Sequence, residues 1–176
     1  MSSLSKGVGT VEVALRWDPS PMGAAPHDLD IVAATYPADA PMGDPAYVVH
    51  FDSRSPDGTI GLARDSRTGQ GFGFDEVLKA ELTRLAPVYG RVVVGVVVQQ
   101  KHGRLTLGEV AGTLVRVSEG PAELWKDDLS GLAGFTAAVV AEFVRTAPGV
   151  WEHRPLLRGM DADPQTFLNL MGRAGA

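Results

Sequence analysis

Apolar and polar residues alternate with a period of two along much of this sequence. In residues 8–17, Val11, Val13 and Leu15 would fall on one side of an extended chain. Glu12 would fall on the other side, because successive side chains of a strand point to opposite faces. Six more segments have alternating or β-branched runs of similar length, which predicts further strands. They are residues 28–36, 46–52, 76–82, 91–99, 112–118 and 122–126.

One of these segments is apolar on both faces. Residues 92–98 read Val-Val-Val-Gly-Val-Val-Val, without the polar positions that a half-exposed strand shows. A strand of this kind is typical of the middle of a sheet with a layer packed on each side. Segments rich in glycine, proline and aspartate separate the strands and predict turns. They are residues 19–26, 37–45, 55–58, 89–90 and 120–121.

The segment 136–145 fits either a helix or a strand. Val139 and Phe143 lie four apart, as on a helical stripe, but they also share one side of a strand. We interpret the segment as a strand. A turn at Pro148 and Gly149 would then lead into residues 150–154 and close a late hairpin.

One helix is expected, at the C-terminal end. Asp163 suits the N-cap and Pro164 the first helical position. Phe167, Leu170 and Met171 would form the apolar stripe. About ten short strands and one helix in 176 residues predict an all-β fold, a β-sandwich of two antiparallel or mixed sheets with a short C-terminal helix. We expect residues 1–176 to form a single domain.

Composition excludes several classes of function. The net charge is −5, with lysine and arginine scattered, so the basic surface that nucleic acid requires is not expected. The chain has no cysteine, which excludes disulfides and thiolate metal sites. Its first residues lack the apolar core of a signal peptide, and the run 92–98 is too short to cross a bilayer. We therefore expect a soluble cytoplasmic protein without membrane insertion.

A glycine-rich loop between acidic ends is the strongest chemical signal. It begins at Asp65, has glycines at positions 69, 71 and 73, and ends at Asp75 and Glu76. Glycine permits unusual backbone angles, and Ca²⁺ binds six to eight oxygens that include backbone carbonyls. The loop lacks the Gly-Lys-Ser/Thr of a phosphate loop, the third glycine of a dinucleotide fingerprint and the ligand spacing of an EF-hand.

A second acidic pair precedes an apolar run. Asp28 and Asp30 stand two apart, so both side chains would leave the same face of a strand and could reach one cation. Aspartate is uncommon in strands, which favours a binding partner over a solvated face. Asp57, by contrast, is interpreted as a residue that caps its own turn.

Several motifs occur in a fixed order along the chain. They are Leu15-Arg16-Trp17-Asp18, Asp28-Leu29-Asp30, Ser55-Pro56-Asp57-Gly58, the loop 65–76 and a late Trp151. Together they resemble the TerD family of tellurium-resistance and stress proteins, over nearly the whole chain. The resemblance implies a bacterial, cytoplasmic β-sandwich that binds Ca²⁺ through acidic loops and has no established catalytic activity.

The resemblance also implies a set of calcium ligands. Carboxylates would come from Asp28, Asp30, Asp65, Asp75 and Glu76, and carbonyl oxygens from the neighbourhood of Thr68 and Gly71. Asp52 lies where relatives usually carry an asparagine pair. The chain departs from the family at Pro26, Arg64, Gln70, Phe72 and Phe74. These changes remove carboxylates, add bulk or add a positive charge, so they should weaken calcium binding and leave one tight site at most.

Two functions follow as expectations. The first is a non-enzymatic, Ca²⁺-dependent sensor or scaffold of the stress response, acting with other proteins of a stress-response complex. The alternative is a divergent TerD-like interaction module that no longer binds calcium tightly. An enzyme is not expected, because the sequence has no Gly-x-Ser-x-Gly elbow and no cysteine for redox chemistry on tellurite.

Overall fold

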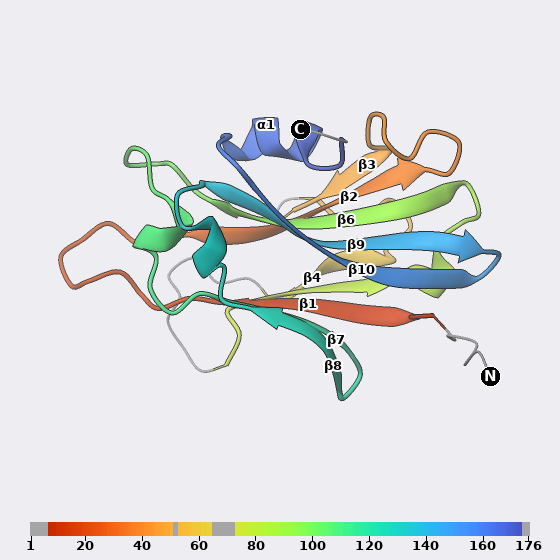
Figure 1. Ribbon diagram of the computed structural model, residues 1–176, viewed down its shortest axis with the longest axis horizontal. Helices are drawn as coiled ribbons and strands as arrows, with labels where there is room; N and C mark the ends of the chain where they lie inside the picture. Colours follow the sequence, from red (N-terminus) through yellow and green to blue (C-terminus); the bar gives the residue numbers. More distant parts are fainter. Residues whose placement is uncertain (1–6, 51–52, 65–72, 174–176) are drawn as a thin grey trace.

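Ten strands in the described residues form two five-stranded sheets, and every strand pair is antiparallel (Figure 1). This is a computed structural model, and it describes residues 7–50, 53–64 and 73–173. Sheet A has the order β4 (Ile60–Arg64), β5 (Glu76–Glu81), β1 (Thr10–Arg16), β7 (Leu114–Glu119), β8 (Ala122–Asp127). Sheet B has the order β10 (Val150–Met160), β9 (Ala137–Ala147), β6 (Tyr89–Val98), β2 (Leu29–Pro37), β3 (Tyr47–Val49). The predicted all-β sandwich is confirmed.

The main core lies between the two sheets. The even-numbered valines of β6, from Val92 to Val98, belong to it together with Val13 and Leu15 of β1. The odd-numbered Val93 belongs to a second cluster on the opposite side of sheet B. The prediction that β6 is a central strand, buried on both faces, is therefore confirmed.

Helix α1 (Pro164–Leu170) covers the outer face of sheet B, so the molecule has three layers in Figure 1. Asp163 accepts a hydrogen bond from the Thr166 backbone N–H at 2.9 Å, which confirms the predicted N-cap. Phe167 is fully buried and packs against Gly95 of β6, where a Cβ atom would lie 2.5 Å from the ring. The buried stripe is Phe167, Leu168 and Met171, whereas the predicted Leu170 is half-buried.

Three short 3₁₀ turns connect the strands: η1 (Leu82–Arg84), η2 (Leu107–Glu109) and η3 (Ser130–Leu132). The segment 136–145, ambiguous in the sequence, is almost entirely strand β9. The first described residues join the late hairpin, because the Val8 backbone N–H donates to the Trp151 carbonyl at 2.8 Å. Trp17 and Trp151 are both buried in the main core.

Some strand boundaries differ from the prediction. Strand β4 was not predicted, because its glycine and alanine residues have low strand propensity. Residues 89–90 were predicted as a turn, but β6 begins at Tyr89. Strand β3 ends at Val49, and residues 51–52 lie outside the described residues. Strand β10 runs on to Met160 through Pro155, which a sheet-edge strand tolerates at a register shift.

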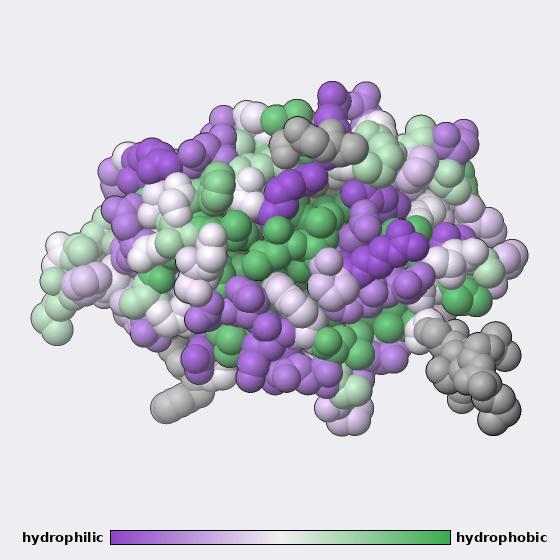
Figure 2. All heavy atoms as spheres, viewed as in Figure 1, coloured by the Kyte–Doolittle hydropathy of each residue, from purple (hydrophilic) through white to green (hydrophobic). Residues whose placement is uncertain are grey.

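The surface shows where the sandwich is covered and where it is open. In Figure 2, apolar residues reach the surface in the middle of the view, over the region of β9 and β10 in Figure 1, and hydrophilic residues surround them. Leu157 of β10 has 39% of its surface exposed. Within the described ranges, no helix has the length and apolar character needed to cross a membrane.

Candidate metal centre

Asp75 and Glu76, at the exit of the glycine loop, are both buried. Glu76 is 0% exposed at the start of β5, and its Oε1 accepts the Ile31 backbone N–H of sheet B at 2.9 Å. Asp75 is 1% exposed, and its Oδ2 accepts the Trp17 backbone N–H at 2.9 Å. Hydrogen bonds from backbone amides to a carboxylate are charge-assisted and strong. They hold the end of the loop against both sheets.

The contact between Glu76 and Ile31 has a clear topological cause. Strand β3 is only three residues long and pairs with residues 33–35 of β2. It therefore leaves the earlier part of that strand edge without a neighbouring strand in the described chain. A buried backbone N–H needs a partner, and the Glu76 carboxylate supplies one for Ile31 across the sandwich.

Asp30 lies on the opposite face of β2 from Ile31. It is 4% exposed, and its Oδ2 accepts a hydrogen bond from the Gln99 side-chain amide. With Val32, Asp30 faces the side of sheet B that α1 covers, and both line a pocket of about 370 Å³. The Glu76 carboxylate thus contacts the backbone of the residue that follows Asp30 in β2.

Asp28 precedes β2 and has a cationic neighbour. Its Oδ2 is 3.3 Å from the Lys101 ammonium, and the lysine side chain is 63% exposed. Asp28 and Lys101 line a second pocket, of about 210 Å³, between residues 24–28 and 99–105. Gln99 lines both pockets, with Asp30 in the first and Asp28 in the second. The two aspartates that were predicted to share one face therefore line different pockets.

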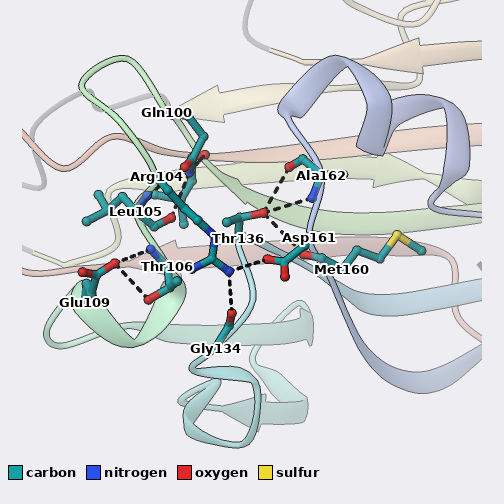
Figure 3. A network of polar contacts seen from close by, with 11 residues as sticks. Gln100, Arg104, Leu105, Thr106, Glu109, Gly134, Thr136, Met160, Asp161 and Ala162 are labelled. Atoms are coloured by element: carbon teal, nitrogen blue, oxygen red, sulfur yellow. Dashed lines mark hydrogen bonds and ion pairs between the residues drawn. The ribbon is translucent and has the colours of Figure 1, made fainter.

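Polar contacts fix the segment that carries Gln99 and Lys101 (Figure 3). The Gln100 side chain accepts from the Leu105 backbone N–H at 2.7 Å and donates to the Leu105 carbonyl at 2.9 Å. The Arg104 guanidinium donates to the Gly134 carbonyl at 3.0 Å and to Asp161 at 2.8 Å. The segment is therefore anchored on both sides of Lys101.

The predicted ligands divide into three groups. Asp30, Asp75 and Glu76 are buried around the starts of β2 and β5, whereas Asp28 is paired with Lys101. Asp52, Asp65, Thr68 and Gly71 lie outside the described residues. Among the residues that the structure describes, no three His, Asp or Glu side chains are grouped so that they could hold a metal ion. A calcium site here would need oxygens of the glycine loop in addition to Asp30 and Glu76, whose hard carboxylate donors suit calcium.

Asp57 has the role that was predicted for it. Its Oδ1 accepts from the Thr59 backbone N–H at 3.1 Å and from the Thr59 hydroxyl at 2.7 Å, so it caps its own turn.

Two neighbours of the acidic residues were missed in the sequence. Gln99 and Lys101 follow strand β6, and nothing in their own spacing suggests a site. The pairing of Leu29 with Val98 places the residues after β6 beside those before β2. In an antiparallel pair, the end of one strand lies beside the start of the other. An assumed pairing of β2 with β6 would therefore have identified Gln99 and Lys101 as neighbours of the two aspartates.

Phe74, one of the departures expected from the sequence resemblance, contacts an arginine. The Arg116 guanidinium lies over its ring, with Cζ 4.4 Å from the ring centroid. This cation–π contact ties Phe74 to strand β7 of sheet A. Phe72 is outside the described residues.

Comparison with known proteins places this arrangement in a family. The model of the TerD domain matches residues 1–169. The tellurium resistance protein TerX of Serratia marcescens is 31% identical over 157 residues, covering 78% of this chain and 72% of that protein. The tellurium resistance protein TerD of an Alcaligenes species is 26% identical over 158 residues, covering 88% and 82%.

A solved structure agrees with the fold described above. It is the crystal structure of a homologue of the telluride resistance protein TerD from Streptomyces coelicolor A3(2), 55% identical, with a TM-score of 0.93. The match covers 96% of this chain and 99% of that one. A family model that spans nearly the whole chain, together with a shared fold at this identity, assigns the protein to the TerD domain family.

Proposed function

We propose that this protein is a cytoplasmic, non-enzymatic Ca²⁺-binding component of a tellurium-resistance or stress response, where it acts as a sensor or scaffold for other proteins. The observation that carries the proposal is the burial of three predicted ligands. Asp30, Asp75 and Glu76 are 4%, 1% and 0% exposed. Burying carboxylates is costly unless they are hydrogen-bonded, paired or bound to a metal ion. Asp75 and Glu76 lie at the end of the glycine loop, and Asp30 lies on β2.

In this proposal each carboxylate has its own task. Glu76 and Asp75 hold the loop exit through the Ile31 and Trp17 amides, and so position loop oxygens for the ion. Asp30 would supply a carboxylate oxygen from β2, and Asp65 one from the loop entrance. Calcium, when bound, contributes a centre of positive charge that orders these oxygens. The ordered loop then forms the surface that a protein partner recognises.

Two contacts favour the alternative, a TerD-like interaction module that no longer binds calcium tightly. Lys101 already places a positive charge 3.3 Å from Asp28. Arg116 holds Phe74, which replaces a ligand, against sheet A. Both arrangements reduce the charge available to a cation, and calcium affinity follows ligand charge. An exposed lysine pair contributes little energy, however, so calcium could displace Lys101 at a small cost.

Thermal unfolding with Ca²⁺, with Mg²⁺ and with EGTA tests the proposal. Free calcium at about 100 times its dissociation constant should stabilise the fold by about 2.7 kcal/mol, since it binds the folded state. Asp30→Asn and Asp65→Asn should abolish this shift while keeping the shape of each side chain. Asp39→Asn removes a carboxylate from an exposed turn and should keep the full shift.

The outcomes separate the two functions. Stabilisation by calcium that is lost in Asp30→Asn and Asp65→Asn but kept in Asp39→Asn supports the calcium-dependent role. Titration calorimetry without any heat at millimolar calcium, together with a melting temperature that EGTA does not change, would reject it and leave the interaction module.

A further inference from the structure

Each sheet ends in two edge strands, and three of these edges are protected in the described chain. At the edge of β4, the Ser55 hydroxyl accepts the Ile60 backbone N–H at 2.9 Å, and the Ser55 backbone N–H donates to the Ile60 carbonyl at 3.1 Å. Strand β10 is contacted by Val8 and contains Pro155. Strand β3 is only three residues long. Covering segments, proline and short strands all hinder the addition of a further strand.

The remaining edge strand, β8, borders sheet A beside β7 (Figure 1). Ala122, Glu123, Leu124 and Lys126 are all exposed. Neither Glu123 nor Lys126 forms an ion pair with another residue of the described chain. Strand β7 is the only strand that pairs with β8 among the residues that the structure describes. This edge is therefore open to another strand.

Strand register shows which backbone groups of β8 point to the open edge. Successive residues of an antiparallel strand turn their backbone groups alternately to one neighbour and to the other. The Leu15 carbonyl accepts a hydrogen bond on the β5 side, so the even-numbered residues of β1 turn theirs to β7. Arg116 and Ser118 pair with these even-numbered residues and turn their groups to β1. Their partners on β8 are Lys126 and Glu123, which therefore direct their N–H and C=O groups to the open edge.

A bulge in β8 sets the spacing of these groups. Glu123 and Lys126 are three apart, and a register shift between their pairings inserts one extra residue into β8. Both lie on the outer face of sheet A, because their partners on β7 alternate with the core residues Val115 and Val117. A regular strand directs its groups to one edge at every second residue, so it cannot match this spacing. A second copy of β8 has the same spacing and matches it.

We propose that β8 pairs in antiparallel orientation with β8 of a second copy of this chain, about a two-fold axis between residues 124 and 125. Glu123 of each copy then lies opposite Lys126 of the other, on the same face, and opposite charges in such cross-strand positions stabilise pairing. Leu124, which is 37% exposed, lies at the axis, whereas Trp125 packs against the main core of its own copy.

The expected dimer is weak. One pair of six-residue strands forms a small interface, and interfaces of this size are typical of transient association. Its formation joins two copies of sheet A into one continuous sheet and leaves α1 and the acidic residues at the glycine loop outside the contact. The proposal rests neither on calcium binding nor on the proposed function.

Sedimentation velocity in EGTA, over a series of protein concentrations, measures the dimer. Glu123→Lys and Lys126→Glu each replace two opposite-charge contacts by two like-charge contacts, so each should weaken dimerisation at least about tenfold. An equimolar mixture of these two variants regains both opposite-charge contacts and should form a heterodimer with the parent affinity. The double variant Glu123→Lys/Lys126→Glu should also dimerise like the parent. Glu152→Lys, a charge reversal at an exposed position of edge strand β10, is the matched control and should change nothing.

Cysteine cross-linking tests the register, because the chain has no cysteine of its own. Hydrogen-bonded residues opposite each other have Cα atoms about 5.5 Å apart, within the range that a disulfide spans. With oxidised glutathione, a mixture of Glu123→Cys and Lys126→Cys chains should give a cross-linked heterodimer and keep one glutamate–lysine contact. Either variant alone should cross-link at least about tenfold more slowly, because its two cysteines lie on opposite sides of the axis, beyond the reach of a disulfide.

Three results would overturn the proposal. The first is a parent chain that stays monomeric at about 1 mM, since even a weak dimer with that dissociation constant would be visible there. The second is an equal loss of dimer in Glu152→Lys and Glu123→Lys, which would reveal unspecific charge effects. The third is a mixture of the two cysteine variants that cross-links no faster than either alone. The cysteine variants also keep the proposal testable if a charge reversal disturbs the fold.

Discussion

The outer faces of the two sheets differ in composition and in what covers them. On sheet B, Val32, Val93 and Val97 are buried beneath α1. On sheet A, the corresponding face carries charged residues such as Glu12 and Lys79, and no helix of the described chain covers it. A strand that is apolar at every position needs a layer on each side, whereas an alternating strand needs only one. Periodicity therefore indicates which sheet has a second cover.

Ion pairs on the two sheets also differ in burial: the pair on sheet B is buried, and the pair on sheet A is exposed. Arg91 of β6 has a side chain that is 5% exposed and lies 2.6 Å from the Glu142 carboxylate. It also donates to the Pro41 carbonyl at 3.0 Å and to the Gly172 carbonyl. Lys79 of β5 is 49% exposed and 3.9 Å from Glu81. The first pair ties the C-terminal segment to sheet B, and the second is an ordinary surface contact.

The largest expected effect comes from the cover of sheet B. Phe167→Ala removes a fully buried ring and should lower the free energy of unfolding by about 4 kcal/mol. Leu124→Ala, on edge strand β8 of sheet A, removes a side chain that is 37% exposed and should cost less than about 0.5 kcal/mol. Urea denaturation of both variants measures the difference. Equal losses would show that α1 is not an integral layer.

Breaking the two ion pairs should lower the stability of the fold by almost equally different amounts. Arg91→Met leaves the Glu142 carboxylate without its buried partner and should cost about 3 kcal/mol. Lys79→Met on sheet A should change stability by less than about 0.5 kcal/mol. Hydrogen exchange provides a second readout, because amides of residues 171–173 should exchange faster only in Arg91→Met. Unchanged exchange would contradict the proposed tether.

A smaller effect is expected at glycines of the two sheets. Gly95→Ala would place a Cβ atom 2.5 Å from the Phe167 ring, and such overpacking should cost about 2 kcal/mol. Gly61→Ala in β4 meets its nearest atom only at 4.0 Å and should be neutral. Adding Phe167→Leu to Gly95→Ala should recover part of the loss. A double-mutant cycle without coupling between positions 95 and 167 would refute this contact.

The smallest effect concerns pH. Burial lowers the pKa of His153, which lies against Phe143 with ring centroids 5.3 Å apart. A lowered pKa means that the folded state resists protonation, so stability is full above about pH 6.5 and falls as the pH decreases below it. His153→Phe should lose this part of the pH dependence, whereas His102→Phe, at an exposed position, should keep it. Melting temperatures between neutral and mildly acidic pH measure both.

Parts of the fold could be predicted because their signals are local. The helix start at Asp163 and Pro164 depends on cap geometry, and the strand β1 on alternation within a few residues. Strand β4 was missed because Gly61 and Ala63 have low strand propensity. Only its antiparallel pairing with β5 identifies this segment as a strand. The end of β10 was missed for a similar reason, since Pro155 is typical of a strand end unless the strand is known to lie at an edge.

The candidate site was predictable as a set of residues but not as an arrangement. The order and spacing of the acidic motifs are enough to identify Asp28, Asp30, Asp75 and Glu76. Their neighbours come from distant segments. Gln99 and Lys101 reach the two aspartates only because β2 and β6 pair in one register.

The sequence by itself determined the strand content, the two-faced burial of β6 and membership in the TerD domain family, because periodicity and motif order are properties of contiguous residues. Only the tertiary structure decided that Glu76 reaches across to Ile31, that Asp30 turns towards α1 and that Lys101 stands beside Asp28. The physical reason is that strand register and the packing of separate layers fix which side chains meet, and both depend on contacts between residues far apart in the chain.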